Sequence, residues 1–457
     1  MPQKFVNVDR NTPMLLSPDL RDWVPENHIV HFLLDALDSV PMHTARVNHR
    51  GTGNEQYPPQ MMLGVLIYGY ITGRFSSREI EAATYSDVAM RYLAADLHPD
   101  HDTLCAFRRN NAALLKETFT SVLLLAKEMK VLKVGTVSVD GTKVMANASK
   151  HKAVSYKRAG EQIELIEAQV DELLKRAADA DSKPLADGLS IPEEIALRKA
   201  RLEKLATARA VIEARAREAA AEQEPGYQEK LAAREAKKAQ GKRPGGKPPK
   251  APDDTPKDGD QFNFTDPESR IMKAGNGKHF EQAFNAQAAV DADGSLLIVG
   301  ARVTNSPNDK QQLAPTVASI PASVGVPAAV AVDNGFYSQQ QIDLVEANRQ
   351  TLVYAAVDKQ THHRSVSDLE AHQEPPPLDE QAAPVEKMAH RLKTAAGKAI
   401  YKLRKETVEP VFGIIKEVMG FRRFSLRGLE KVTLEWDLVA VAFNLKRLFT
   451  LKNLKAA

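Results

Sequence analysis

The chain has 457 residues, of which 43% are hydrophobic and 26% are charged, and its formal net charge is +3. These values are typical of a soluble globular protein with two or three domains, and no run of about 18 apolar residues suggests a membrane span. The polar first sixteen residues do not match a signal peptide. Cys105 is the only cysteine, which excludes an internal disulfide and a multi-cysteine zinc site, so we expect a reducing, cytoplasmic setting.

We predict that residues 1–130 form a helical N-terminal domain that binds DNA. Apolar residues recur at helical spacing in several segments, which polar turns separate, and Ser77 is placed to cap the second helix. Short helices with tight turns are typical of a helix-turn-helix DNA reader and equally typical of a small helical bundle. The expected helices cover residues 57–73, 77–83 and 87–94, and a longer one starts near Thr103 and runs through Phe119.

Residues 131–152 and 270–457 alternate between strand and helix patterns, which predicts an α/β catalytic domain. Residues 134–144 are β-branched and alternating, so they predict a strand that Asp140 closes. Residues 327–333 form a short apolar run that ends at Asp333, as in a strand buried on both faces. The other expected strands are 283–291, 296–304 and 351–355, with a hairpin turn at 292–294. The expected helices start near Asp309 or cover 339–347, 385–419 and 432–451.

Residues 153–240 predict a helical insertion. Apolar residues recur at spacings of three and four among charged ones, which is typical of a coiled-coil seam about two heptads long. A second such segment covers 195–220, so the two helices would form a hairpin joined by a loop at 182–191. Residues 241–269 begin with a Pro-, Gly- and charge-rich stretch and predict a flexible linker. The apolar residues of the first seam are Ile163, Ile166, Val170, Leu173 and Ala177.

Asp140 and Asp333 are the first candidate site residues. An acid at the carboxyl end of a central strand is poorly placed for a core but well placed over a ligand crevice. Two such acids on neighbouring strands would repel each other unless a cation lies between them. A pair of Mg²⁺ or Mn²⁺ ions would relieve this repulsion and would also activate water for attack on a phosphodiester. The alternative is that both aspartates simply cap turns at strand ends.

Glu409 is the third candidate, and it lies in the most basic part of the chain. Residues 385–457 hold 16 Lys and Arg against 7 Asp and Glu, an excess that would attract a polyphosphate or simply solvate a helical surface. Pro410 is expected to limit the helix and make Glu409 its start. Glu409 among these cations would be a metal ligand beside groups that bind phosphate, or else a salt-bridged glutamate on an amphipathic helix.

Three segments resemble the DDE transposases of bacterial insertion sequences. They are Val139-Asp140-Gly141-Thr142, Val332-Asp333-Asn334-Gly335-Phe336-Tyr337 and Val408-Glu409-Pro410-Val411-Phe412-Gly413. The chain is most similar to the branch whose glutamate helix bears a Tyr-Arg-Glu-Lys signature, and residues 285–291, 303–305, 420–424 and 426–429 resemble the same branch. The resemblance implies a ribonuclease-H-like catalytic domain.

Carried over by position, the resemblance makes Asp140, Asp333 and Glu409 the catalytic ligands of Mg²⁺ or Mn²⁺, with two ions expected. It makes Tyr401, Arg404 and Lys416 the signature residues that hold DNA near the cut. Three residues usually separate the signature arginine and glutamate, but four separate Arg404 and Glu409. Lys405 occupies the strict position, so either residue could fill the role. The further residues expected to bind backbone phosphates are Arg422, Arg423 and Arg427.

The expected function is a DNA transposase that binds the inverted repeats at the ends of its element. Metal-activated water would cleave the phosphodiester at each end, and the released 3′-hydroxyl would attack target DNA. The expected partners are double-stranded DNA and further copies of the chain, as a dimer or larger synaptic complex associated with the bacterial nucleoid. The alternatives are a ribonuclease-H-like nuclease without strand transfer and a non-catalytic DNA-binding descendant of a transposase. Trp436 is expected in the core rather than against a flipped base.

Overall fold

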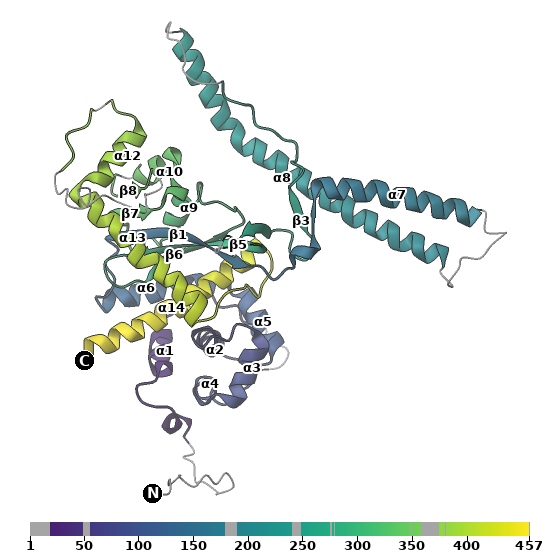
Figure 1. The fold of residues 1–457 in the computed structure, drawn as a ribbon. Helices are drawn as coiled ribbons and strands as arrows, with labels where there is room; N and C mark the ends of the chain where they lie inside the picture. The colour runs from purple at the N-terminus through teal and green to yellow at the C-terminus, as the bar shows by residue number, and fades with distance from the viewer. Residues whose placement is uncertain are drawn as a thin grey trace, which may run out of the picture.

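The structure is a computed structural model that describes residues 19–48, 55–178, 190–239, 248–274, 277, 279–347, 349–357, 374–379 and 381–456. It is a mixed α/β structure in which a central sheet lies among helices and a long helical arm extends away from it (Figure 1). Most of the loop expected at 182–191 and the first part of the expected linker lie outside the described residues. Among the described helices, none combines the length and apolar character needed to cross a membrane.

The N-terminal region is helical, as predicted, although two boundaries differ from the sequence prediction. Ser76 rather than Ser77 caps the third α-helix, in a capping box with Glu79. The helix expected from Thr103 through Phe119 is two helices, because the chain leaves helical geometry at Asn111. The elements are η1 (Leu20–Trp23), α1 (Ile29–Asp38), α2 (Pro59–Ile71), α3 (Ser77–Ser86), α4 (Val88–Leu93), α5 (His101–Asn110) and α6 (Ala112–Glu128).

The central sheet has six strands and mixes antiparallel with parallel pairs. Its order is β4-β5-β1-β7-β8, with β6 also paired to β5. β1 runs antiparallel to β5 and parallel to β7, and β7 runs parallel to β8. The predicted strands and hairpin are confirmed, and the short β4 adds an edge pairing. The strands are β1 (Thr136–Met145), β4 (Arg270–Lys273), β5 (Phe280–Asp291), β6 (Ile298–Thr304), β7 (Ala329–Val332) and β8 (Leu352–Ala355).

Helices lie on both sides of this sheet. In Figure 1, α9 and α10 lie above it and α6 and α14 beneath it, while α13 crosses β1 and β7. The long helix predicted from 385 to 419 is interrupted at Thr394, whose side chain caps α13. Pro410 does not limit the helix as expected, because it lies inside α13. The elements are α9 (Leu313–Val317), η4 (Asn334–Phe336), α10 (Gln339–Glu346), α12 (Pro384–Lys393), α13 (Ala395–Gly413), the π-helical turn η5 (Ile414–Val418) and α14 (Leu429–Ala456).

The insertion predicted between β1 and β5 is a helical arm with its own small core. α7 (Tyr156–Ala178) packs along the first part of α8 (Ile191–Ala239), and the rest of α8 extends beyond α7, with the chain that follows running back beside it (Figure 1). Ile166 and Val170 of the predicted seam are buried there against Leu205 and Ile212. At the base of the arm, η2 (Lys150–Lys152) leads into β2 (Ala153–Ser155), which pairs with β3 (Gln261–Asn263). Strand β3 and the buried Asp266 and Ser269 thus fall within the range expected to be a linker.

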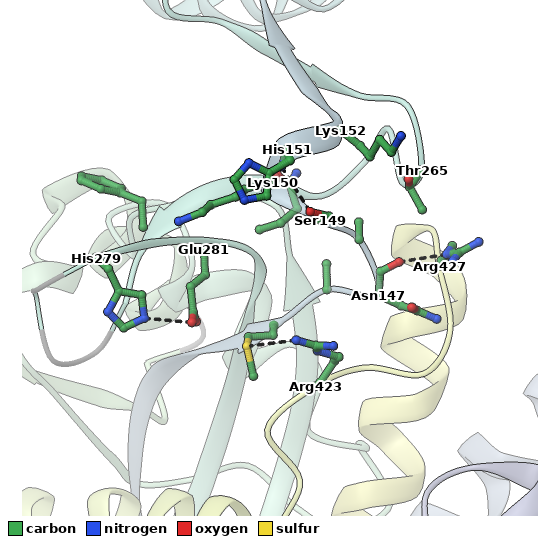
Figure 2. Close-up of a pocket in the computed structure, with 15 residues that line it drawn as sticks. Asn147, Ser149, Lys150, His151, Lys152, Thr265, His279, Glu281, Arg423 and Arg427 are labelled. Atoms are coloured by element: carbon green, nitrogen blue, oxygen red, sulfur yellow. Dashed lines mark hydrogen bonds and ion pairs between the residues drawn. The ribbon is translucent and has the colours of Figure 1, made fainter.

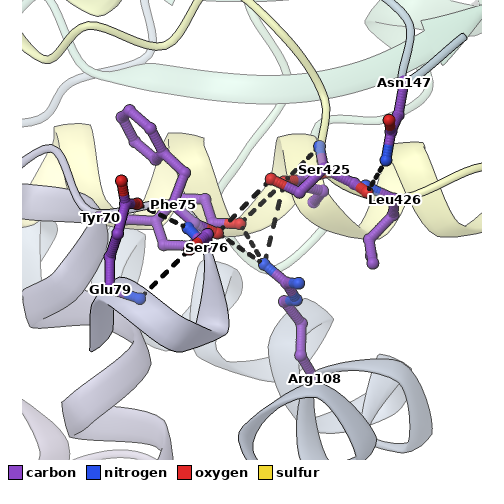
Figure 3. A network of polar contacts seen from close by, with 9 residues as sticks. Tyr70, Phe75, Ser76, Glu79, Arg108, Asn147, Ser425 and Leu426 are labelled. Carbon is purple, nitrogen blue, oxygen red and sulfur yellow. Dashed lines mark hydrogen bonds and ion pairs between the residues drawn. The ribbon is translucent and has the colours of Figure 1, made fainter. Parts of the chain in front are cut away.

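One continuous hydrophobic core joins the N-terminal helices to the sheet and to α14. Tyr70, Arg108 and Glu435 form a buried polar network inside it, drawn in part in Figure 3. Glu435 also accepts hydrogen bonds from the backbone N–H groups of Ser425 and Leu426. Trp436 is fully buried and donates to the Gln287 carbonyl, so its predicted place in the core is confirmed.

Candidate active site

Asp140 and Asp333 lie on adjacent parallel strands. Thr136 pairs with Ala329 and Ser138 with Ala331, and the same register continued by two residues sets Asp140 beside Asp333. Asp140 does not close its strand as expected, because β1 continues to Met145 in its pairing with β5. Asp333 directly follows β7 and precedes η4, but its side chain makes no capping hydrogen bond there. Neither aspartate therefore has the turn-capping role that was the alternative.

The pair of acids carries uncompensated negative charge. Burial and, after it, the neighbouring charge of Asp333 raise the pKa of Asp140 to about 7. The Gly141 N–H donates to Asp140 Oδ1 at 2.7 Å. This hydrogen bond and the charge of Arg404 both lower the pKa of Asp140, but by less than burial raises it. Asp333 Oδ1 is buried and has no hydrogen-bond partner. A buried carboxylate oxygen without a partner is costly, so the pair is suited to accept a cation.

Helix α13 brings Glu409 to the same place. The Arg404 guanidinium lies 3.6 Å from Asp140 Oδ2 through Nη1 and 3.4 Å from Glu409 Oε1 through Nη2. Arg404 is only 10% exposed, whereas Glu409 is 54% exposed. The Tyr401 ring lies one turn earlier, 5.9 Å from the Arg404 guanidinium carbon. The Arg404 guanidinium thus lies between Asp140 and Glu409, and Asp333 lies beside Asp140.

The two lysines of the signature region lie apart from the acids. Lys405 is exposed on the other side of α13 from Arg404, so it is Arg404 that contacts the acids. Lys416 lies in the π-helical turn η5, and its Nζ donates to the Lys143 carbonyl at 2.9 Å. Burial lowers the pKa of Lys416. Lys416 therefore contacts the C-terminal part of β1 rather than the acids.

The three predicted arginines lie on the loop between η5 and α14, beyond the acids along β1. Arg422 is paired with Glu417. Arg423 reaches Met145, whose backbone forms a bridge with this loop. The Arg427 Nε donates to the Asn147 carbonyl at 2.9 Å. These arginines border the exit of β1 and do not touch Asp140, Asp333 or Glu409.

A polar cluster on the opposite face of β1 was not predicted. Asn285 and Gln287 each donate to Asp309 Oδ1 at 2.7 Å, and Lys143 Nζ lies 3.9 Å from the same atom. A Cβ added at Gly141 would lie 2.3 Å from Gln287 Nε2 and 2.6 Å from Asp309 Oδ1. The glycine after Asp140 is therefore required by this close packing. In the sequence, the only sign of this close packing was a glycine inside a predicted strand.

The acids do not form a ready-made metal cage. Among the residues that the structure describes, no group of three or more His, Cys, Asp or Glu side chains is placed to hold a metal ion. The Arg404 guanidinium instead supplies the positive charge between Asp140 and Glu409. Carboxylate oxygens are nevertheless the ligands that Mg²⁺ and Mn²⁺ prefer, and Asp333 holds an unpaired one. The donor chemistry thus fits a hard divalent cation.

Two family models match the ends of the chain. Residues 377–449 match a "Transposase DDE domain", and residues 18–110 match a "Transposase domain (DUF772)". Both matches support a DDE transposase of an insertion sequence. Comparison with curated proteins and with solved structures gave no match. The first match contains Arg404 and Glu409, whereas Asp140 and Asp333 lie outside both matched ranges. The partner that a transposase family implies is DNA.

Proposed function

We propose that this transposase cleaves the phosphodiester bonds at the ends of its element and joins the 3′-hydroxyl ends to target DNA. Asp140, Asp333 and Glu409 hold Mg²⁺ or Mn²⁺, most simply as two ions. The observation that carries the proposal is that Arg404 lies between Asp140 and Glu409, while Asp333 lies beside Asp140 with one carboxylate oxygen left without a partner. The antiparallel and parallel strand pairs and the flanking helices support the ribonuclease-H-like fold that the resemblance implies.

The bound metal supplies a nucleophilic water at neutral pH and neutralises charge on the reacting phosphate. Arg404 moves from its acid contacts toward the phosphate oxygens, since guanidinium groups bind phosphate in a forked geometry. Tyr401 supports the Arg404 guanidinium from one side. In-line displacement at phosphorus needs positioning and charge neutralisation, and no protein nucleophile has to take part. Arg404 rather than Lys405 thus fills the signature position.

The partners follow from the reaction. Two element ends must be cut and joined together, so we propose a homodimer or larger complex on duplex DNA at the bacterial nucleoid. The N-terminal helices are proposed to bind the end sequences, and the coiled-coil arm of α7 and α8 is proposed to contact a second copy. The strongly basic C-terminal segment supports DNA binding through backbone phosphates.

The test is metal-dependent cleavage of DNA that carries the element ends. Asp140→Asn, Asp333→Asn and Glu409→Gln should each lower the cleavage rate by at least about a hundredfold, because each removes a proposed ligand. Glu406→Gln is the matched control, since Glu406 lies on the same helix but is exposed and pairs only with Lys402 at 3.9 Å. Unchanged cleavage in the three site variants would refute the site assignment. Cleavage without joined products in a paired-end assay would favour the nuclease alternative.

A further inference from the structure

A basic cavity opens where β1 leaves the sheet and enters the helical arm. Its volume is about 600 Å³. Figure 2 shows that its walls come from the exit of β1 and η2, from the start of β5, and from the loop before α14. The charged residues on these walls are Lys150, Lys152, Glu281, Arg423 and Arg427, with His151 and His279 beside them. The cavity thus brings together four cations from two separate segments.

The positive charge of this cavity is not neutralised by neighbouring acids. Lys150, Lys152, Arg423 and Arg427 form no ion pair with a carboxylate among the described residues. Glu281 is the single acid among the described lining residues, and it is held by His279 at 2.9 Å. A concave surface with unpaired cations attracts a polyanion. The cavity therefore has the positive charge of an anion-binding site, and no carboxylate among the described residues occupies it.

The backbone around the cavity is held in place by hydrogen bonds. The Asn263 side chain donates to the Ser149 carbonyl at 2.9 Å, and the Phe264 N–H donates to the Lys152 carbonyl at 3.0 Å. Arg427 is fixed by its bond to the Asn147 carbonyl. A preformed site loses less entropy when its ligand binds. The η2 turn at the base of the arm thus presents Lys150 and Lys152 in a fixed position.

The cavity lies in line with the acids along β1. Met145 is five positions after Asp140 in this strand, which corresponds to about 17 Å. The same length corresponds to about five base pairs of duplex DNA. Lys416 contacts the Lys143 carbonyl between the two places, so cations follow the strand from Arg404 to the cavity. A phosphate backbone laid across the acids would reach the cavity.

We propose that this cavity binds the phosphodiester backbone of duplex DNA about five base pairs from the bond held by the acids. The inference rests on the proposed function, because it takes Asp140, Asp333 and Glu409 as the point of cleavage. Single-strand binders use several aromatic platforms, whereas Phe280 is the one Phe, Tyr or Trp among the described lining residues. The base of the helical arm thereby becomes part of the DNA-binding surface.

The test compares DNA affinity across salt concentrations in the full chain. A labelled duplex of about 30 base pairs is titrated in EDTA, and fluorescence anisotropy gives the affinity between about 50 and 200 mM KCl. In the double variant Lys150→Gln/Lys152→Gln, the slope of log affinity against log salt should fall by about two, since each lost phosphate contact removes about one. The matched control is Lys199→Gln/Lys204→Gln, which removes two exposed lysines from α8 and should keep the wild-type slope.

Three outcomes would overturn the inference. The cavity variant could keep the wild-type slope, the control could lose as much slope as the cavity variant, or the loss could appear only with a labelled single strand. Binding is measured without metal, so it is independent of cleavage. If cleavage requires the three acids but the slopes are equal, the cavity assignment fails and the proposed function stands. If the acid variants cleave normally, the proposed function fails whatever the slopes show.

Discussion

The uncompensated charge at the acid pair predicts that Asp140→Asn stabilises the metal-free protein. The pKa of Asp140 rises from 3.8 to about 7 in the fold, mainly through burial and then through the charge of Asp333. Between these values the unfolded chain has lost the proton while the folded chain keeps it. The stability contributed by this group is therefore complete below about pH 4 and is lost as the pH rises toward 7.

The size of this effect follows from the same shift. A rise from 3.8 to about 7 corresponds to at most about 4 kcal/mol, but the side chain is 18% exposed, and solvent screens part of the cost. Asparagine also gives up the charge contact with Arg404, so we expect a net gain of about 1–3 kcal/mol at pH 8. Urea unfolding in EDTA at pH 4.5 and at pH 8 measures it, and the gain should nearly vanish at the lower pH.

Added Mg²⁺ completes this experiment. It should raise the stability of the wild type and have little effect on Asp140→Asn, since a ligand stabilises only the state that binds it. Asp171→Asn is the control, because Asp171 is exposed on α7 and should show neither effect. A variant less stable than the wild type at pH 8 in EDTA, or a difference independent of pH, would refute the reasoning about Asp140.

Three further predictions concern stability. Arg108→Met breaks a buried ion pair and leaves Glu435 uncompensated, so it should cost about 3–5 kcal/mol in urea unfolding, and a cost below about 1 kcal/mol would contradict the buried network. Gly141→Ala places a Cβ 2.3 Å from Gln287 Nε2 and should cost about 1–3 kcal/mol by the same measurement, whereas a neutral result would mean that the cluster can yield. Burial raises the pKa of Asp437 to about 7, so Asp437→Asn should gain stability over the wild type as the pH rises from 4 to 7, and a gain that shrinks over this range would have the wrong sign.

The strands could be predicted because their patterns are local. The alternation around Val137 and Val139 and the apolar run before Asp333 indicate strands without knowledge of their partners. The pattern over 134–144 predicted the length of β1 to within two residues, and only the expectation that Asp140 closes the strand was wrong. Beyond Asp140 the strand is held by pairing with β5, which follows the whole helical arm in the sequence. The position of Asp140 within the strand therefore depends on contacts that the local pattern does not show.

Helix boundaries were predicted less well, for an equally physical reason. Pro410 removes one backbone donor, and α13 nevertheless continues through it, since the residues around it pack on the sheet. Val408, Val411 and Phe412 are buried, and this packing offsets the lost hydrogen bond. Helix propensities of individual residues do not include tertiary packing of this kind. The break at Asn111 likewise follows from tertiary contacts.

The candidate site was predicted residue by residue only through the resemblance. Spacing left the choice between Arg404 and Lys405 open, because a one-residue difference on a helix turns a side chain by about 100°. The contacts of Arg404 with two acids come from the docking of α13 on β1. The cluster around Asp309 is formed by residues from three segments that are far apart in the sequence. The only local sign of it was Gly141, a glycine inside a strand.

The buried network of Tyr70, Arg108 and Glu435 also has a consequence for biosynthesis. Arg108 and Glu435 are 327 positions apart, which corresponds to roughly 16 to 65 s of synthesis at ordinary rates. During this interval the nascent chain holds an arginine whose native acceptor has not yet left the ribosome. Products that terminate before α14 lack Glu435 altogether, so they should be poor at reaching a compact state and become early substrates for proteolysis.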